Sequence, residues 1–389
     1  MYRIGKEETA AVERVIESRD LFRINKGTRE VLTFEQELRE KFGISQSLYL
    51  TSGTAALISI LTAMGIGPGD EVIVPAYTFI ASPNAVLATG AIPVLAEVDA
   101  TLTMDPADVE NKITDRTKAI MPVHICGFPC NMDAIMAVAK RHNLTVVEDA
   151  CQAVGASYKG KRLGTIGHAG AYSFNFFKII SAGEGGAVVT DDQELYERAL
   201  IFHDVGTPYW SYERELAQTF FVGSQFRANE ICAAVMRVQL TRLDGILADL
   251  RRIKKTMAEN LAGRKNIAFI PSNDIAGDMG TVLPFRFETE ALARKFSETL
   301  GNSNLPVDVN RHVFIYWKPI LEKRGAYNER MNPYNMPYNQ NGKFEITKDS
   351  GPNSLGHLSR TVYVYMQPDM QPDAIDQLTE KCAATAAEL

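Results

Sequence analysis

The sequence predicts an α/β fold: a large domain whose mostly parallel sheet is covered by helices, followed by a smaller α+β domain. Two patterns predict it. Short apolar runs rich in β-branched residues recur in the first half without apolar–polar alternation, as expected for strands buried on both faces. Helical patterns separate these runs, which is the order of βαβ units. With 389 residues, 46% of them hydrophobic, the chain has enough apolar side chains for about two domains.

The large domain is expected to contain helices at residues 8–18, 54–64, 132–141 and 194–202. Strands are expected at residues 71–74, 92–98, 119–123, 144–147 and 186–190. Val12, Val15 and Ile16 share one face of the first helix. A glycine cluster at positions 65, 67 and 69 ends the second helix. Gly, Pro and Asp bound the predicted strands, because these residues favour turns.

A long helical pattern starts near Ala228 and continues to Leu261. We interpret it as a helix that leaves a large domain, residues 1–245, and enters a small domain, residues 246–389. The small domain is expected to contain strands at 267–270, 282–287 and 361–365 and helices at 290–300 and 372–386. Residues 323–357 are rich in Asn, Pro, Gly and Tyr, which predicts a long surface loop.

Composition and charge exclude several classes of protein. The net charge is −6 and no basic block occurs, so neither nucleic acid nor an anionic membrane is expected as a partner. The most apolar stretch, residues 55–66, is far shorter than the ~20 residues that span a bilayer. Residues 1–8 lack an apolar signal core, so export is not expected. Five scattered cysteines fit a reducing cytoplasm better than a disulfide framework.

Residues 51–56 (TSGTAA) form the first stretch with a chemical signal, because an apolar run ends there and a helix begins. The free N–H groups and the dipole of a helix N-terminus bind anions, and small residues let a phosphate approach closely. Taken alone, the stretch is explained better by simple N-capping through Ser52 or Thr54.

Residues 146–153 (VVEDACQA) place two acids and an amide just after a buried strand. In open α/β sheets, ligands collect outside the carboxyl ends of the strands. An acid at that place can hold a protonated ring nitrogen. An Asp that caps the following segment explains this stretch equally well when it is taken alone.

Residues 171–186 contain one lysine, Lys178, among apolar and aromatic residues, followed by a glycine-rich turn. Burial lowers the pKa of an ammonium group and yields an amine that can form a Schiff base. Most lysines instead extend along the surface with the charge in water. The apolar flanks and the Gly-Glu-Gly-Gly turn favour the reactive lysine here.

Together, and in this order, the stretches resemble the DegT/StrS family of sugar aminotransferases, which are fold-type I enzymes that use pyridoxal phosphate (PLP). The resemblance extends from about residue 7 to residue 257, and the C-terminal third matches only loosely. It rests on residues 52–56, 69–75, 77–79, 148–153 and 173–186.

The resemblance implies a role for each matching position. Lys178 would form the Schiff base with PLP and, once released, carry a proton between the substrate carbon and the cofactor. Asp149 would keep the pyridine nitrogen protonated, so that the ring accepts electrons. Gln152 would lie near the phenolic oxygen, and Phe79 would stack on the ring. The residues expected to hold the phosphate are Gly53, Thr54 and Ser173.

Two comparisons with the family pattern refine this picture. The family often has Gly-x-Asn-x-Arg after the lysine, with an Asn that reaches the phosphate of the neighbouring subunit. Here residues 223–227 read GSQFR, so Gln225 takes that position and keeps the amide donor. This contact between subunits leads to the expectation of a homodimer. Family members that are sugar dehydratases have His in place of the lysine, so the presence of Lys178 argues against that reaction.

No metal site is expected. Cys126 and Cys130 lie near His124, but they do not form a double Cys-x-x-Cys pattern and no second Cys/His pair follows nearby. Structural cysteines, with His124 packed or hydrogen-bonded in the core, explain these residues better.

The resulting interpretation is a PLP-dependent aminotransferase that moves an amino group from L-glutamate or L-glutamine to a keto sugar in two half-reactions. The family's acceptors include nucleotide-linked keto sugars, cyclitol ketones and eight-carbon ulosonic acids. Residues 313–317 resemble members that aminate the eighth carbon of an octulosonate. Residues 203–212, with His203, Asp204, Tyr209, Trp210 and Tyr212, are expected to form either a loop over the site or exposed interface. The residues expected to contact the acceptor are Arg311, His312, Tyr316 and Trp317.

Three alternatives remain open at this point. One is an aminotransferase for cyclitol ketones. Another is a non-catalytic regulator on the same fold, which would not need a reactive lysine. The third is a different PLP reaction, such as decarboxylation or elimination, because the choice of reaction depends on which substrate bond lies perpendicular to the ring.

Overall fold

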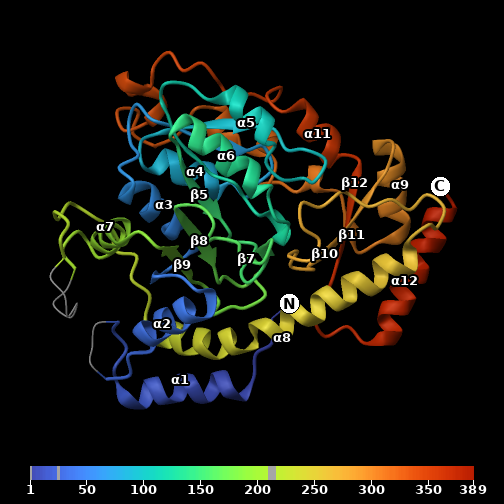
Figure 1. Cartoon of the computed structure of the whole chain (residues 1–389), viewed down its shortest axis with the longest axis horizontal. Helices are drawn as coiled ribbons and strands as arrows, with labels where there is room; N and C mark the ends of the chain where they lie inside the picture. Colours follow the sequence, from blue (N-terminus) through green and yellow to red (C-terminus); the bar gives the residue numbers. More distant parts are fainter. Residues whose placement is uncertain (1, 24–26, 209–215) are drawn as a thin grey trace.

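A seven-stranded sheet forms the centre of the larger part of the molecule in this computed structural model, which describes residues 2–23, 27–208 and 216–389 (Figure 1). The strand order is β1-β9-β8-β5-β4-β2-β3. Strands β3, β2, β4, β5 and β8 run parallel, while β9 is reversed and pairs antiparallel with β8 on one side and with the edge strand β1 on the other. The strands are β1 (Gln46–Leu50), β2 (Glu71–Pro75), β3 (Ile92–Ala96), β4 (Thr117–Ile120), β5 (Thr145–Asp149), β8 (Ala169–Ser173) and β9 (Gly186–Thr190).

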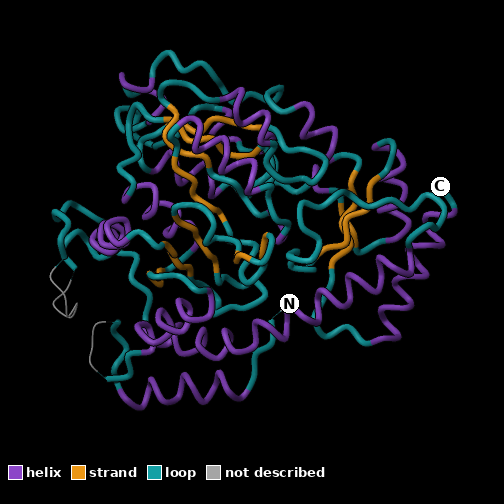
Figure 2. The backbone as a smooth tube through the Cα atoms, viewed as in Figure 1, coloured by secondary structure: helices purple, strands orange, loops and turns teal. Residues whose placement is uncertain are grey.

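Helices cover both faces of this sheet (Figure 2), and the side chains alternate between two cores. In β2, Val72 and Val74 join the core beneath α3, whereas Ile73 joins the core on the other face. Because both faces are covered, the strands are apolar throughout and show no alternation in sequence. The helices of this part are α1 (Lys6–Ser18), α2 (Glu30–Phe42), α3 (Gly53–Ala63), α4 (Ala81–Ala88), α5 (Pro106–Lys112), α6 (Met132–His142) and α7 (Gln193–His203).

A second, antiparallel sheet with the strand order β10-β12-β11 forms the smaller part. Helix α8 joins the two parts, and it packs on α1 and α2 at one end and on α12 at the other (Figure 1). The long helix predicted from Ala228 onward is therefore confirmed. The elements are α8 (Glu230–Leu261), β10 (Val282–Arg286), α9 (Glu290–Leu300), β11 (Ser303–Asn304), α10 (Lys318–Leu321), α11 (Pro352–Leu358), β12 (Thr361–Tyr365) and α12 (Pro372–Ala387); a small hairpin, β6 (Ser157–Tyr158) and β7 (Lys161–Arg162), lies between β5 and β8.

The strand predicted at residues 267–270 is wrong. Only Phe269 bridges to Phe285 of β10, with the Arg286 amide donating to Ala268 O and the Ile270 amide to Pro284 O. Pro284 faces this side of β10 and has no N–H to return to residue 270, so the ladder ends after one bridge.

The surface loop predicted at residues 323–357 is also only partly correct. The segment contains α11 and two short 3₁₀ turns, and Asn339 within it is buried. The Asn339 side chain accepts from the Gly69 amide at 2.7 Å and donates to Gly90 O at 2.8 Å. Asparagine side chains that bond to the backbone allow a polar segment to be buried. Most of the segment is irregular and exposed, as predicted, but buried residues such as Asn339 fasten it to the large domain.

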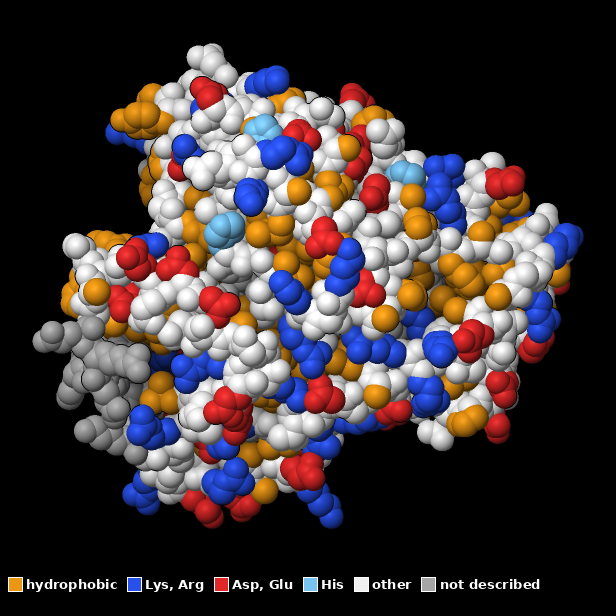
Figure 3. Space-filling model, viewed as in Figure 1, with side chains coloured by type: hydrophobic (Ala, Val, Ile, Leu, Met, Phe, Trp, Pro, Cys, Tyr) orange, Lys and Arg blue, Asp and Glu red, His pale blue; other side chains and the backbone are white. Residues whose placement is uncertain are grey.

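The division at residues 245 and 246 stays a prediction. Ser354, on the C-terminal side of that division, bonds through its hydroxyl to Glu97 and Val98 near the end of β3. The C-terminal segment therefore returns to the large sheet. No helix among the described residues is long and apolar enough to cross a membrane. Charges of both signs are interspersed over the face shown in Figure 3.

Candidate active site

The three stretches that carry the chemical signals meet at one edge of the large sheet. Asp149 is the last residue of β5, and Ser173 is the last residue of the neighbouring β8. Gly53 begins α3, and a Cβ atom placed on it would lie 2.9 Å from Ser173 Cβ and 2.6 Å from Cys151 Sγ. The carboxyl ends of the strands and the N-terminus of α3 therefore form one site, as expected for open α/β sheets.

The N-terminus of α3 presents two unused backbone donors. Ser52 caps the helix, because its side chain accepts from the Ala55 amide at 3.1 Å and its carbonyl accepts from the Ala56 amide at 3.0 Å. The amides of Gly53 and Thr54 are the first two N–H groups of the helix, and they have no hydrogen-bond partner among the described residues. Capping and anion binding, the two explanations of this stretch, are therefore compatible here.

Asp149 is almost fully buried, and each of its oxygens accepts one hydrogen bond. Oδ1 accepts from the Cys151 amide at 3.1 Å, and Oδ2 accepts from the Ser82 hydroxyl at 2.6 Å. Ser82 lies 2.6 Å from the Thr78 hydroxyl, which completes a buried chain. These bonds hold the carboxylate in place, and each oxygen keeps a lone pair for a further donor. Ser82 is not identifiable from the sequence, because no local pattern marks it as a partner of Asp149.

Glu148, the other acid of this stretch, has a structural role. Its carboxylate accepts from the Gly164, Ile166 and Gly167 amides at 2.6–2.7 Å and lies 2.9 Å from His124 Nε2. Both oxygens are thus occupied by the loop after β7 and by the buried histidine. Asp149 is the acid of the pair that keeps free acceptor capacity in the site.

His124 and the two nearby cysteines also have structural contacts. His124 Nδ1 accepts from the Cys130 amide at 3.1 Å, so Nε2 is the nitrogen that donates to Glu148. Cys130 Sγ donates to Val123 O. Among the described residues, no group of three or more His, Cys, Asp or Glu side chains is arranged to hold a metal ion.

Lys178 follows β8 in a turn that returns to β9, and its side chain is half-buried. Burial lowers the pKa of its ammonium group, and the nearby Cys151, Asp149 and Cys126 oppose this effect. The flanking Phe176 and Phe177 are 61% and 72% exposed. The groups that act on the lysine therefore come from the ends of β4 and β5, while its own aromatic neighbours point outward.

The C-terminal third contributes residues 311–313 to the same site. The Thr78 amide donates to His312 O at 2.8 Å, and the Ile80 amide donates to Arg311 O at 2.7 Å. The His312 ring lies 5.4 Å from the Phe79 ring, and its Nε2 is 3.4 Å from Gln152 Nε2. Burial and the Lys178 charge lower the pKa of His312 to about 4, so this ring is neutral near pH 7. Four predicted site residues thus gather here from distant parts of the chain: Phe79, Gln152, Arg311 and His312.

The remaining predicted site residues differ in their exposure. Tyr316 is 43% exposed, whereas Trp317 is fully buried and donates from its indole N–H to Arg311 O at 3.3 Å. The expectation that Trp317 contacts the acceptor is wrong for this structure, because its ring belongs to the core beneath Arg311. Gln225 is exposed on the segment whose Phe226 carbonyl accepts from the Thr51 amide, beside the start of α3.

The expected loop at residues 203–212 is only partly described. His203 and Asp204 are fully buried, and Asp204 pairs with Arg227, so neither residue belongs to a mobile cover or an exposed interface. Tyr209, Trp210 and Tyr212 lie outside the described residues.

Comparison with known proteins agrees with this geometry. The family model described as the DegT/DnrJ/EryC1/StrS aminotransferase family matches residues 2–382. GDP-perosamine synthase of Caulobacter vibrioides is 41% identical over 268 residues, covering 68% of this chain and 70% of that protein. The spore coat polysaccharide biosynthesis protein SpsC of Bacillus subtilis is 34% identical over 97% of this chain and 94% of its own length. The crystal structure of 3-amino-5-hydroxybenzoic acid synthase superposes with a TM-score of 0.81 at 28% identity, covering 100% of this chain and 98% of that one.

Proposed function

The chain belongs to the DegT/DnrJ/EryC1/StrS aminotransferase family, and from this premise we propose that it aminates an anionic keto sugar, with L-glutamate or L-glutamine as the amino donor. The protein is a PLP-dependent aminotransferase, as the family and its relatives are. The observation that carries the proposal is the meeting of Arg311 and His312 with Phe79 and Gln152 beside Lys178. A nucleotide-linked keto sugar is the preferred acceptor, because two relatives are named GDP-perosamine synthase.

PLP, when bound, supplies a ring that takes up the electrons of the bond that breaks at the amino acid's α carbon. We assign Lys178 to hold the cofactor covalently and, once displaced by the donor's amine, to move the proton at that carbon through Nζ. Its lowered pKa keeps a larger share of the side chain as the free amine, which is the form that attacks and accepts protons. Asp149, fixed by Ser82 and the Cys151 amide, would keep the ring nitrogen protonated.

We assign the phosphate to the N-terminus of α3 and to Ser173. Gly53→Ala is expected to weaken PLP binding about tenfold or more. An added Cβ would lie 2.6 Å from Cys151 Sγ and 2.9 Å from Ser173 Cβ, so the phosphate site must shift. Titration of the apo-protein with PLP measures the affinity. The matched control is Gly356→Ala, where a Cβ meets nothing within 4 Å. Equal affinities in both variants would place the phosphate elsewhere.

We assign Arg311 to the anionic group of the acceptor and His312 to its sugar hydroxyl groups. Arg311, whose carbonyl accepts from the Ile80 amide, has an exposed side chain that forms no ion pair with any residue that the structure describes, so its charge is available to a diphosphate or a carboxylate. The neutral His312 ring is suited to sugar hydroxyl groups, because its buried Nδ1 has no hydrogen-bond partner within the described ranges. A cyclitol ketone has no anionic group for Arg311, so this acceptor is the second candidate.

Arg311→Ala is expected to raise KM for the keto sugar about tenfold or more, because it removes one charge-assisted contact, and to leave KM for the amino donor within about twofold. Steady-state kinetics with a GDP-linked keto sugar, an eight-carbon ulosonic acid oxidised at C8 and an inosose measure both constants. Arg311→Lys should recover part of the loss. A preference for the inosose, with no effect of Arg311→Ala, would overturn the proposal of an anionic acceptor.

We further propose that the enzyme works as a homodimer in which Gln225 of one protomer reaches the phosphate site of its partner. Gln225 is exposed, as are the large apolar side chains of Val222 on the same segment (91%) and of Phe177 in the turn after β8 (72%). A second subunit would cover such side chains. Sedimentation of the PLP-loaded protein is expected to give twice the mass of the 43.0 kDa chain, and a monomer would contradict the shared site.

We place the enzyme in the cytoplasm, because its five cysteines are all free thiols in the structure. Fractionation of cells that express it tests this location, and recovery outside the cytoplasmic fraction would contradict it.

A further inference from the structure

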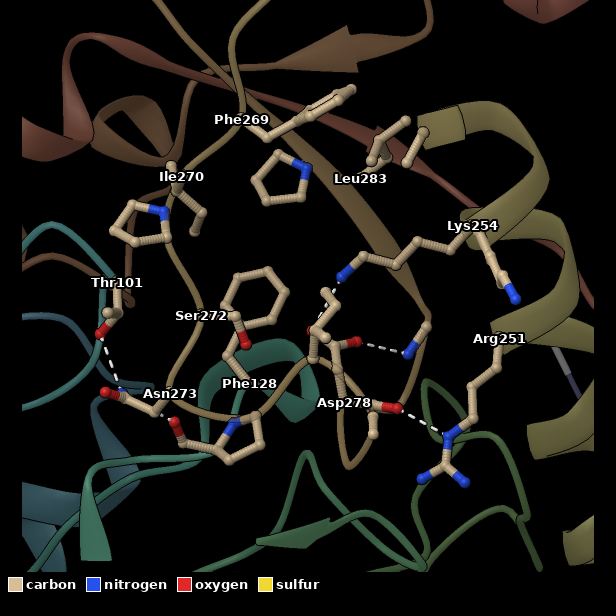
Figure 4. A pocket seen from close by; sticks show the side chains of 18 of the residues that line it. Thr101, Phe128, Arg251, Lys254, Phe269, Ile270, Ser272, Asn273, Asp278 and Leu283 are labelled. Carbon is tan, nitrogen blue, oxygen red and sulfur yellow. Dashed lines mark hydrogen bonds and ion pairs between the residues drawn. The ribbon is translucent and has the colours of Figure 1, made fainter. Parts of the chain in front are cut away.

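A cavity of about 520 Å³ lies between α8 and the segment that leads from α8 into β10 (Figure 4). None of the residues proposed for the cofactor or for the acceptor lines it. Figure 4 shows Lys254 and Arg251 reaching in from α8, with Thr101 and Asn273 on the opposite side. The volume is in the range of small-molecule sites, about 300–1,000 Å³.

Most of the cavity wall is apolar. Phe128 comes from the loop after β4, Phe269 and Ile270 from the segment before β10, and Leu283 from β10 itself. Phe128 and Leu283 are nearly inaccessible to bulk water, while Ile275 on the rim is 69% exposed, so the cavity has a buried interior and an open side. Apolar cavities of this kind hold water poorly and accept apolar groups instead.

A buried ion pair forms the polar part of the wall. Lys254 Nζ donates to Asp278 Oδ2 at 2.8 Å, and both side chains are less than 10% exposed. Asp278 Oδ1 accepts from the Gly280 amide at 2.7 Å, so both of its oxygens are occupied. Lys254 has three N–H donors, of which the described residues use the one to Asp278, and its charge lies 5.1 Å from the centre of the Phe128 ring.

The charges around the cavity favour an anion. Three cationic side chains line it and two carboxylates oppose them: Lys254 pairs with Asp278, and Lys255 lies 3.8 Å from Glu259. Arg251 is the third cation. The Arg251 guanidinium donates to Asp278 O at 2.7 Å and to Gly277 O at 3.1 Å, so its hydrogen-bond partners are neutral carbonyls rather than carboxylates. An acceptor group that enters beside Lys254 would therefore meet a net positive field and a free ammonium donor.

We propose that this cavity is a second ligand site, separate from the cofactor, that binds a small aromatic carboxylate. The aromatic ring lies between Phe128 and Phe269, where ring–ring contacts add to the burial of apolar surface. The carboxylate accepts hydrogen bonds from the free N–H groups of Lys254, while the Lys254–Asp278 pair stays intact.

Titration calorimetry of the full-length, PLP-loaded protein with 2-naphthoate tests the site. Binding of 2-naphthoate is expected. The neutral 2-naphthamide is expected to bind about tenfold more weakly, because it lacks the negatively charged carboxylate that accepts from the Lys254 ammonium group. Arg311→Ala should leave the affinity for 2-naphthoate unchanged, since Arg311 belongs to the other site. No binding of 2-naphthoate, equal binding of the amide, or a loss in Arg311→Ala would overturn the proposal.

Two variants of α8 locate the bound ligand. Ala258 lines the cavity, so Ala258→Phe fills it and is expected to weaken 2-naphthoate binding about tenfold or more. Ala248 is exposed on the same helix and does not line the cavity, so Ala248→Phe is expected to bind like the wild type. Where Ala258→Phe fails to fold, Ile270→Trp fills the cavity from the opposite wall and has the same expected result. Unchanged affinity in a folded cavity-filling variant would place the ligand elsewhere.

Discussion

Lys178→Ala is expected to lower the rate of amino transfer at least about 10³-fold and to abolish the visible absorption of covalently held PLP. The variant loses both the amine that holds the cofactor and the group that moves the proton at the substrate carbon. Neighbouring groups cannot take over, because burial raises the pKa of the Cys126 thiol to about 12 and lowers that of His312 to about 4. Absorption spectra and product analysis measure the two effects.

The matched control is Lys140→Ala, which removes an exposed lysine at the end of α6 and should leave both readouts at the wild-type level. Thermal unfolding of the two variants separates a chemical defect from a folding defect. A Lys178→Ala protein that is folded and retains more than about a tenth of the wild-type activity would remove Lys178 from the proposed role.

Asp149→Asn is expected to lower kcat about 10²–10³-fold while PLP still binds. The amide keeps the shape of the side chain, but it lacks the negative charge that holds a proton on the ring nitrogen, and loss of one such electrostatic contact typically costs this much. Ser82→Ala should have a smaller effect in the same direction, because it frees Asp149 Oδ2 without removing the charge. Single-turnover kinetics with the amino donor measure the step directly.

Asp376→Asn, an exposed change on α12, serves as the control for Asp149→Asn. Wild-type kcat in Asp149→Asn, or an equal loss in the control, would contradict the assignment of Asp149 to the ring nitrogen.

The large sheet was predictable where its strands are apolar throughout. Runs such as residues 71–74 and 144–147 are short and apolar throughout, so a buried strand was the interpretation they favoured. Helix α9 begins and ends at the predicted residues. Strand β8 was not predicted, although it carries Ser173. Its sequence, AGAYS, contains no β-branched residue, and Gly170 packs so closely that a Cβ on it would lie 2.1 Å from Gly164 O.

The candidate site was predictable only where its residues lie within one short stretch. Asp149 and Gln152 follow one strand, and Gly53 begins a helix, so local patterns and the family resemblance located them. Ser82 joins the site through a contact across 67 positions. The backbone bonds that bring Arg311 beside Ile80 also depend on the folded chain, as does the burial of Trp317. The cavity beneath α8 could not be predicted from any sequence motif, because its lining residues come together only in the folded chain.

The most direct test of the proposed amino transfer is a half-reaction. L-Glutamate is added to the PLP-loaded protein without an acceptor, and the released 2-oxoglutarate is counted against the number of active sites, with L-glutamine tested in parallel. One keto acid per site is expected with at least one of the two donors, together with loss of the visible absorption and its return when a keto sugar is added. Release of carbon dioxide or ammonia in place of a stoichiometric keto acid, or no change with either donor, would contradict the account.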